Sequence, residues 1–257
     1  DGPAAVALGR RFGVPVSIKA RGADIHHWGR APATAGQVLA AGKAAAGLLA
    51  VSQAMKADMA TLGMPADRIR VHHTGVDLTR FAPRDQAAAK AALGVSGPLV
   101  ASVGALIPRK GHDIVIDAVA ALPGVSLQIA GEGPERPRLA AQIARLGLGD
   151  RVKLLGSVAH GDLPPLLAAA DVMALASSSE GLANAWVEAL ASGTPIVIPD
   201  AGGAAEVVTS TDAGRIAART APAFAAAIGA LLAVPPQRDA GRAAAAGFTW
   251  YAITVAL

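Results

Sequence analysis

The second part of the chain, residues 95–257, alternates two hydropathy patterns at regular intervals. Short, mainly apolar runs end in glycine or a polar loop, and each is followed by a segment with apolar residues at helical spacing. Apolar runs without alternation are typical of strands buried on both faces, and the helical spacing predicts helices between them. The predicted strands are residues 99–103, 125–130, 152–155, 172–176 and 196–198, and the predicted helices are 112–122, 136–146, 163–170, 183–191 and 204–208. This order predicts an α/β fold with a doubly wound parallel sheet.

The first part of the chain repeats this scheme more loosely. The predicted strands are residues 16–20, 48–51 and 68–72, the predicted helices are 38–46 and 53–62, and a helix-like apolar stretch precedes residue 16. Ser52 is expected to cap the helix that begins at Gln53. Residues 78–96 contain Pro83 and predict a linker. We therefore expect two Rossmann-like parallel-sheet domains, 1–94 with the linker and 95–257.

The two ends of the chain add a further expectation. Asp1 is not an initiator methionine, and the segment after it lacks the features of a signal peptide. The chain stops at Ala256 and Leu257 without a helix-capping signal. The pattern therefore predicts a fragment that is cut at both ends and has an incomplete first domain.

Composition narrows the class of protein. Hydrophobic residues make up 53% of the chain and charged residues 16%, which supports a packed core and argues against disorder. There is no cysteine, which excludes disulfides, thiolate metal sites and a cysteine nucleophile. No apolar run approaches the roughly 18–20 residues that span a bilayer. We expect a cytoplasmic protein.

The net charge of +4 is unevenly distributed. Residues 1–94 carry 12 Lys/Arg and 6 Asp/Glu, a surplus of +6, whereas residues 95–257 carry 11 and 13, a balance of −2. A basic face can attract phosphates, anionic lipid or nucleic acid, and it can equally be a solvated surface. Aromatic residues make up only 3% of the chain and are not interleaved with arginine, which argues against nucleic-acid binding.

Two carboxylates follow the predicted strand 172–176. Glu180 lies in a glycine-containing loop, and Glu188 lies eight positions later in the predicted helix, about 12 Å along a helical path. A strand end, a glycine loop and a helix start form an anion site at the edge of the sheet where ligands bind. Carboxylates this far apart can hold two polyols with a diphosphate between them, as in a nucleotide sugar. The structural alternative is a helix-dipole acid at Glu180 and a solvated Glu188.

These carboxylates belong to a series of motifs that resembles one family. Their E-x7-E spacing resembles that of the retaining glycosyltransferases of the GT4-like group (glycosyl transferases group 1), which have the GT-B fold. The resemblance covers nearly the whole chain. Its other motifs, in order, are residues 21–24 (Arg-Gly-Ala-Asp), 74–77 (Thr-Gly-Val-Asp), 103–111 (Val-Gly-Ala-Leu-Ile-Pro-Arg-Lys-Gly), 129–134 (Ile-Ala-Gly-Glu-Gly-Pro), 152–156, 170–172, 193–197 and 202–206.

The resemblance implies roles for the loop residues of the second domain. Glu188 would accept hydrogen bonds from ribose hydroxyls, Glu180 would contact the donor hexose, and Lys110 would neutralise the leaving diphosphate. The family often has arginine after the first loop glycine, where this chain has Ala105. Arg109 is the candidate second cation, or else a surface charge at a helix start. The remaining expected donor-binding residues are Gly104, Gly131, Gly181, Leu182, Ala183 and Asn184.

The first domain offers weaker candidates. Asp24 and His26 follow a predicted strand and are candidate acceptor-side residues. His26-His27 and His72-His73 are adjacent pairs that would point to opposite faces of a strand, so we expect no metal site. Residues 131–136 imitate a dinucleotide fingerprint, but Arg136 replaces its last glycine, which indicates a loop near the donor base instead.

The resemblance implies a retaining transferase that moves a hexose from a nucleoside-diphosphate sugar to an acceptor hydroxyl, without a metal or cofactor. Bacterial polysaccharide, glycolipid or cell-envelope synthesis is the expected context. Two alternatives stay open: a sugar-nucleotide epimerase or phosphorylase of the same architecture, and a nucleotide-sugar-binding fragment without catalysis. Expected partners are the donor and an acceptor glycan or lipid-linked sugar. The basic first domain suggests an anionic acceptor and peripheral contact with the inner face of the plasma membrane.

Overall fold

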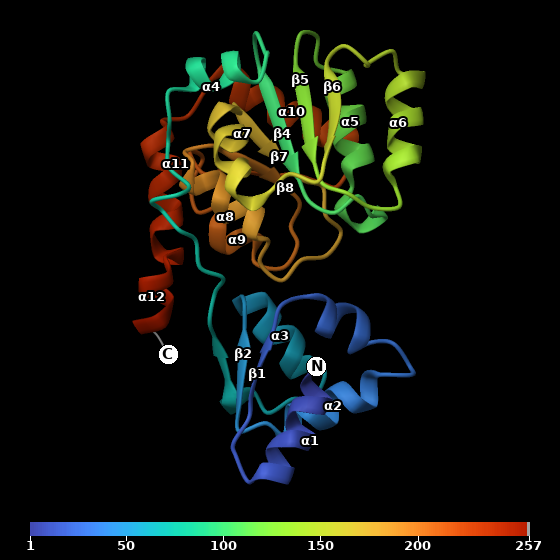
Figure 1. The fold of residues 1–257 in the computed structure, drawn as a ribbon, viewed down its shortest axis with the longest axis vertical. Helices are drawn as coiled ribbons and strands as arrows, with labels where there is room; N and C mark the ends of the chain where they lie inside the picture. Colours follow the sequence, from blue (N-terminus) through green and yellow to red (C-terminus); the bar gives the residue numbers. More distant parts are fainter. Residues whose placement is uncertain (256–257) are drawn as a thin grey trace.

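The computed structural model describes residues 1–255, so Ala256 and Leu257, where we expected a cut end, lie outside the described residues. Two parallel sheets form two units, one above the other in Figure 1. The larger sheet has the strand order β6-β5-β4-β7-β8-β9. Its strands are β4 (Leu99–Val103), β5 (Ser126–Ala130), β6 (Val152–Gly156), β7 (Val172–Ala174), β8 (Ile196–Ile198) and β9 (Gly214–Ile216). The predicted α/β class and doubly wound parallel sheet are confirmed.

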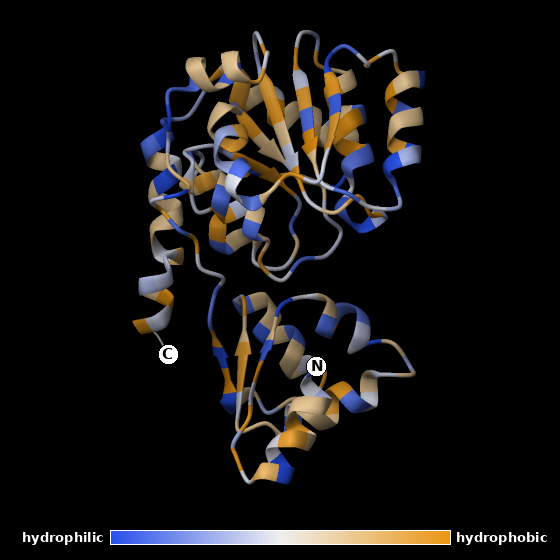
Figure 2. Ribbon diagram, in the orientation of Figure 1, coloured by the Kyte–Doolittle hydropathy of each residue, from blue (hydrophilic) through white to orange (hydrophobic). Residues whose placement is uncertain are grey.

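Both faces of the larger sheet are buried, as its apolar strands predict. Leu99 and Ala101 belong to one hydrophobic cluster, whereas Val100 between them belongs to the other. The same alternation holds in β7, where Met173 packs on the first face and Val172 on the second. Figure 2 shows these strands as mostly hydrophobic. Because successive side chains of a strand point to opposite faces, such a sheet needs helices on both sides.

Helices cover the two faces as that argument requires. One face carries α5 (His112–Ala120), α6 (Arg136–Arg145) and α10 (Ala221–Ala233), and the other carries α4 (Gln86–Ala92), α7 (Leu163–Ala169), α8 (Asn184–Ala191) and α11 (Arg238–Ala245). A short helix, α9 (Ala204–Val207), follows β8. Each predicted strand and helix of this part is present, with its ends shifted by at most two residues.

The smaller unit has a sheet of three parallel strands in the order β1-β2-β3. They are β1 (Ser17–Ala20), β2 (Gly47–Ala50) and β3 (Ile69–Val71), and they pack with α1 (Gly2–Phe12), α2 (Ala35–Ala44) and α3 (Gln53–Thr61). Ser52 caps α3 as predicted, because its hydroxyl accepts a hydrogen bond of 3.0 Å from the Met55 amide.

The predicted linker at 78–96 is wrong in part. Residues 86–92 form α4, which packs against α7, and Asp85 caps it by accepting a hydrogen bond from the Ala88 amide. The run of alanines in α4 has high helix propensity, which outweighed the polar, proline-containing start of the segment. The irregular connection between the sheets therefore consists of residues 72–85, called the crossover below, and of a short loop after α4.

The end of the described chain returns to the crossover. The last helix, α12 (Trp250–Val255), lies beside it at the left of Figure 1. The Val76 amide donates to the Phe248 carbonyl at 2.7 Å. Arg242 on α11 donates to the carbonyls of Leu78 (2.9 Å) and Phe81 (3.0 Å). A guanidinium that satisfies two crossover carbonyls fixes the path of this segment against the second unit.

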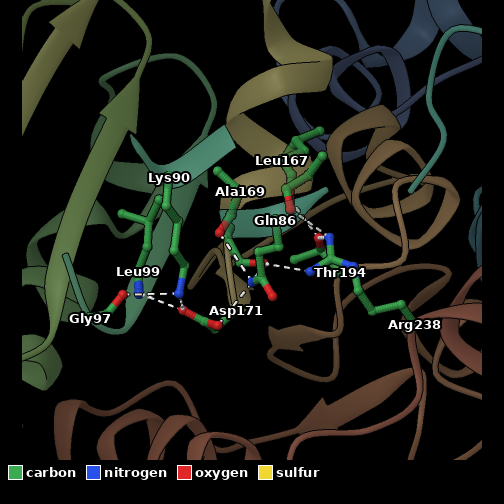
Figure 3. Close-up of polar contacts among 11 residues, drawn as sticks. Gln86, Lys90, Gly97, Leu99, Leu167, Ala169, Asp171, Thr194 and Arg238 are labelled. Carbon is green, nitrogen blue, oxygen red and sulfur yellow. Dashed lines mark hydrogen bonds and ion pairs between the residues drawn. The ribbon is translucent and has the colours of Figure 1, made fainter. Parts of the chain in front are cut away.

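A half-buried polar joint fastens α4 to the larger sheet (Figure 3). Asp171 stands just before β7, and its carboxylate accepts hydrogen bonds from Lys90 Nζ (2.7 Å), the Leu99 amide (2.7 Å) and Gln86 Nε2 (2.9 Å). Nearby, Arg238 donates to the carbonyls of Ala168 (2.6 Å) and Ser192 (3.1 Å), at the ends of α7 and α8. Burial lowers the pKa of Arg238 from its usual value.

Replacing Asp171 should destabilise the second unit. Asp171→Ala leaves the half-buried Lys90 ammonium without its carboxylate partner and the Leu99 amide without its acceptor, at an expected cost of about 2–3 kcal/mol. Urea unfolding followed by circular dichroism measures the loss. Ala in place of the exposed Asp150 is the matched control and should change stability by less than about 0.5 kcal/mol. Equal midpoints for the two variants would contradict the role given to this joint.

Candidate functional site

The carboxyl ends of the larger sheet's strands open onto a cavity of about 340 Å³. The cavity lies next to the smaller unit, which contributes Arg21 from the end of β1. The predicted site residues that line it are Gly104, Lys110, Glu180, Leu182, Ala183, Asn184 and Glu188. Parallel strands bring the loops after β4 and β7 to one edge, and this is why residues 104–110 and 180–188 meet.

Glu180 is a buried carboxylate with two cationic partners. It is 7% exposed, forms an ion pair with Lys110, and has Arg109 Nη1 at 3.6 Å from its Oε2. Arg109 also donates to the Ser179 carbonyl. A buried carboxylate needs such partners to remain charged. The two cations expected to face a diphosphate are therefore held by Glu180, and an anionic ligand would have to share or take them.

Glu188 is also buried, at 7% exposure, so the alternative of a solvated helix residue is wrong. Its Oε1 lies 2.9 Å from Nε2 of His160, on the short helical turn before α7. The sequence reasoning missed His160, whose only signal was its place just after a strand, in a loop at the carboxyl edge. The two carboxylates therefore have different partners: Glu180 faces a lysine and an arginine, and Glu188 faces an imidazole.

The start of α8 presents backbone donors to the same cavity. Ala183 is the N-cap residue of α8, and no side chain caps this end. Leu182, Ala183 and Asn184 line the cavity, and Asn184 is exposed. Uncapped amides at a helix start, aided by the helix dipole, favour an anion.

Two of the predicted glycines serve close packing. A Cβ at Gly131, which has φ 155°, would lie 1.9 Å from the Gly104 carbonyl oxygen. A Cβ at Gly181 would lie 2.4 Å from the Arg21 carbonyl oxygen. Gly131 therefore lets the loop after β5 support the Gly104 loop, and Gly181 lets the Glu180 loop touch the smaller unit.

A buried histidine supports the Gly104 loop. His112, at the start of α5, places Nδ1 3.0 Å from Ser102 Oγ and Nε2 3.2 Å from the Gly104 carbonyl oxygen. The carbonyl can only accept, so Nε2 carries the proton and Nδ1 accepts from the Ser102 hydroxyl. Burial lowers the pKa of His112 to about 4, so it is neutral at pH 7. The sequence showed His112 only as the first residue of a helix.

The two acceptor-side candidates differ in their contacts: Asp24 is bonded within its own turn, and His26 contacts the larger unit. The Asp24 carboxylate accepts hydrogen bonds from the Arg21 amide (2.8 Å) and the Gly22 amide (3.2 Å), so it holds the turn after β1. His26 lies on a π-helical turn (Asp24–Trp28) that follows the end of β1. Its Nδ1 is 2.7 Å from Ser179 Oγ in the other unit, and its Nε2 is 2.7 Å from an oxygen of Asp58. His26 thus bridges the units beside Glu180.

The second histidine pair diverges. Nδ1 of His72 lies 2.7 Å from Lys19 Nζ, and Nε2 of His73 lies 2.9 Å from Glu206 of the larger unit. Burial is the main cause of a lowered pKa for both Lys19 and His72. Within residues 1–255, no group of three or more His, Asp or Glu side chains has the arrangement to hold a metal ion.

Comparison with known proteins gives the same family over both units. The family model described as "Glycosyl transferases group 1" matches residues 83–247, and the one described as "Glycosyltransferase Family 4" matches residues 1–80. D-inositol 3-phosphate glycosyltransferase of Mycobacterium tuberculosis is 41% identical over 210 residues, which are 76% of this chain and 44% of that protein. The chain spans less than half the length of the curated relatives it matches.

Solved structures match the whole chain. Anabaena Alr3699/HepE in complex with UDP aligns with a TM-score of 0.88 at 26% identity, covering 99% of this chain and 74% of that one. Sucrose-phosphate synthase from Thermosynechococcus elongatus aligns with a TM-score of 0.89 at 26% identity, covering 99% and 69%. The placement of the two sheets in this chain is therefore like that in these proteins.

Acid should destabilise the protein through His112. Its folded pKa of about 4 lies below its ordinary value of 6.5, so the unfolded chain takes up the proton first. The contribution of neutral His112 to the free energy of unfolding is therefore fully present above about pH 6.5, and it is lost as the pH drops towards 4. At about pH 4.5 the wild type should have lost roughly 2–3 kcal/mol more than His112→Gln, whose amide does not titrate. Urea midpoints at several pH values test this, and parallel pH curves would contradict it.

Proposed function

Because the chain belongs to the glycosyl transferases group 1 and has the predicted GT-B fold, we propose that it binds a nucleoside-diphosphate sugar. We propose further that the whole protein transfers the hexose to an acceptor hydroxyl with retention of configuration. One observation carries the proposal: two buried carboxylates, Glu180 and Glu188, line one cavity together with Lys110 and an uncapped helix start.

The cavity offers a different partner to each part of the donor. Glu188 Oε2 is the carboxylate oxygen turned away from the His160 bond, and it would accept hydrogen bonds from the ribose hydroxyls. The amides at the start of α8 would face the diphosphate. Glu180, next to the cations, would contact the hexose. The complexes of Alr3699/HepE with UDP support uracil as the first base to test.

The chemistry asks the site to stabilise a leaving diphosphate. As the anomeric C–O bond breaks, charge develops on the phosphate oxygen and on the sugar ring. Lys110 and Arg109 would shift from Glu180 towards that charge, and Glu180 would stay close to the cationic sugar. In the proposed front-face step, the acceptor oxygen bonds to the anomeric carbon and its proton passes to the leaving phosphate. These cations would replace the divalent metal that other transferases use.

We propose an anionic or membrane-associated acceptor on a bacterial envelope or glycolipid route, with contact at a membrane face. The carboxyl-terminal half of α1, at the bottom of Figure 1, and the turn after it expose Leu8, Phe12 and Val14 near Arg10 and Arg11. Exposed apolar side chains next to cations suit the interface of an anionic bilayer. No helix within residues 1–255 has the length and apolar character to cross a bilayer.

Calorimetry with UDP, GDP and ADP, run in EDTA, should detect binding of at least one nucleotide. Lys110→Ala should weaken that binding roughly 10- to 100-fold, since a charged contact contributes about 1.5–3 kcal/mol. Lys153→Ala, an exposed change in the same unit, is the control.

Glu188→Ala should also weaken nucleotide binding, whereas Glu180→Gln should leave nucleotide affinity unchanged and mainly lower turnover of the longer enzyme.

Three results would count against this assignment. Wild-type affinity in the Lys110→Ala variant would remove the phosphate role. Opposite effects of the Glu188 and Glu180 changes would mean that their roles are exchanged. Binding or turnover that EDTA abolishes and Mg²⁺ restores would contradict the metal-independent step.

Vesicle sedimentation tests the membrane contact. The protein should bind phosphatidylglycerol-containing vesicles at low salt and release them as salt rises, because each Lys or Arg near an anionic surface contributes about 1 kcal/mol. Replacing Arg10 and Arg11 by Gln should remove most of this binding, whereas Arg145→Gln, exposed on the other unit, should not. Equal binding to neutral and anionic vesicles would exclude docking through the basic face, and binding to neither would exclude membrane docking altogether.

A further inference from the structure

One histidine connects the candidate ribose carboxylate to the crossover between the two units. His160 places Nε2 2.9 Å from Glu188 Oε1 and Nδ1 3.3 Å from Arg80 Nη1. The Phe81 ring lies beside it, with the two ring centroids 5.3 Å apart. Arg80 and Phe81 belong to the crossover, so a single imidazole contacts both the cavity and the connection between the units.

The partners fix the tautomer of the neutral imidazole. A guanidinium only donates hydrogen bonds, so Nδ1 of His160 must accept from Arg80. The proton of the neutral ring then sits on Nε2 and is donated to Glu188. The result is a directed chain from Arg80 through His160 to Glu188, which exists only while His160 is neutral.

The crossover is fastened to α8 at a second point. Arg242 donates to the Phe81 carbonyl at 3.0 Å and to the Ala191 carbonyl at 2.7 Å. Glu188 and Ala191 are three residues apart on α8, so both fastenings act on the same part of that helix. The crossover is therefore linked to α8 twice, through His160 at Glu188 and through Arg242 at Ala191.

We propose that His160 is a positioning residue that sets the Glu188 carboxylate for the ribose hydroxyls and makes nucleotide affinity depend on pH. The proposal rests on the proposed function, because it takes Glu188 as the ribose acceptor. The charged side chains that contact His160 are Arg80 from the crossover and Glu188 from α8, and Asp162 follows it on the same turn. Arg80 and Glu188 respond in opposite ways when His160 gains a proton.

Protonation changes both contacts of His160. The added proton on Nδ1 faces the Arg80 guanidinium, so the bond becomes a repulsion and the crossover loses that anchor. The imidazolium at the same time holds Glu188 more tightly and competes with the ribose hydroxyls. Nucleotide affinity should therefore be lower at about pH 5 than at about pH 8, because acid favours the imidazolium form.

Calorimetry with whichever of UDP, GDP and ADP the wild type binds tests this across that pH range. We expect the wild-type affinity to fall roughly 5- to 20-fold from high to low pH, the size of one charge-assisted hydrogen bond. His160→Gln, whose amide can accept from Arg80 and donate to Glu188, should keep the high-pH affinity and flatten the pH profile. His160→Leu should be weak at every pH, and Arg80→Gln should reduce the slope.

The possible results distinguish failure of the role of His160 from failure of the proposed nucleotide binding. A wild type that binds none of the three nucleotides overturns the proposed function, and the role of His160 with it. Nucleotide binding that is sensitive to Lys110→Ala, but has the same pH profile in wild type and His160→Gln, overturns the role of His160 alone. A folded His160→Leu variant with wild-type affinity would do the same.

Discussion

The structure depends on how one buried carboxylate is neutralised. Glu180 has little exposure, and a charge in that position is tolerated only with cations at hand, which Lys110 and Arg109 supply from the loop after β4. This pairing ties the loop after β7 to the loop after β4. The same loop reaches the other unit, where His26 bonds the hydroxyl of Ser179. The loop that carries this carboxylate therefore links the cavity, the cations Lys110 and Arg109, and one contact between the units.

The two units meet through backbone as well as side chains. Gly181 packs so close to the Arg21 carbonyl that a side chain would collide with it. On the other side of this contact, Glu206 accepts hydrogen bonds at 2.9 Å from the Gln53 amide, at the start of α3, and from His73. A carboxylate at a helix start is favoured by the dipole and the free amides. A cavity lies between the units, lined by Arg21 of the smaller unit and by Gly104, Lys110 and the start of α8 of the larger unit.

Prediction worked best where hydropathy contrast was strong. The strands β4, β5, β7 and β8 are buried on both faces, and their apolar runs marked them within about two residues. Contrast is low in residues 214–255, which are rich in alanine, and β9, α10, α11 and α12 were not predicted there. Alanine fits a helix, a buried contact or an exposed surface, so its spacing carries little information. The π-helical turn at Asp24–Trp28 likewise depends on packing and not on periodicity.

The sequence by itself determined that Glu180 would stand in a loop and Glu188 on the following helix, because strand, glycine loop and helix are local patterns. Only the tertiary structure decided what each carboxylate faces. Lys110 is 70 residues from Glu180, and His160 is 28 residues from Glu188. The tertiary structure also decided that His26 contacts Ser179, 153 residues away in the sequence, whereas the Asp24 carboxylate accepts from the nearby Arg21 amide. Local periodicity places a residue on an element, whereas the order of strands in the sheets determines which loops meet.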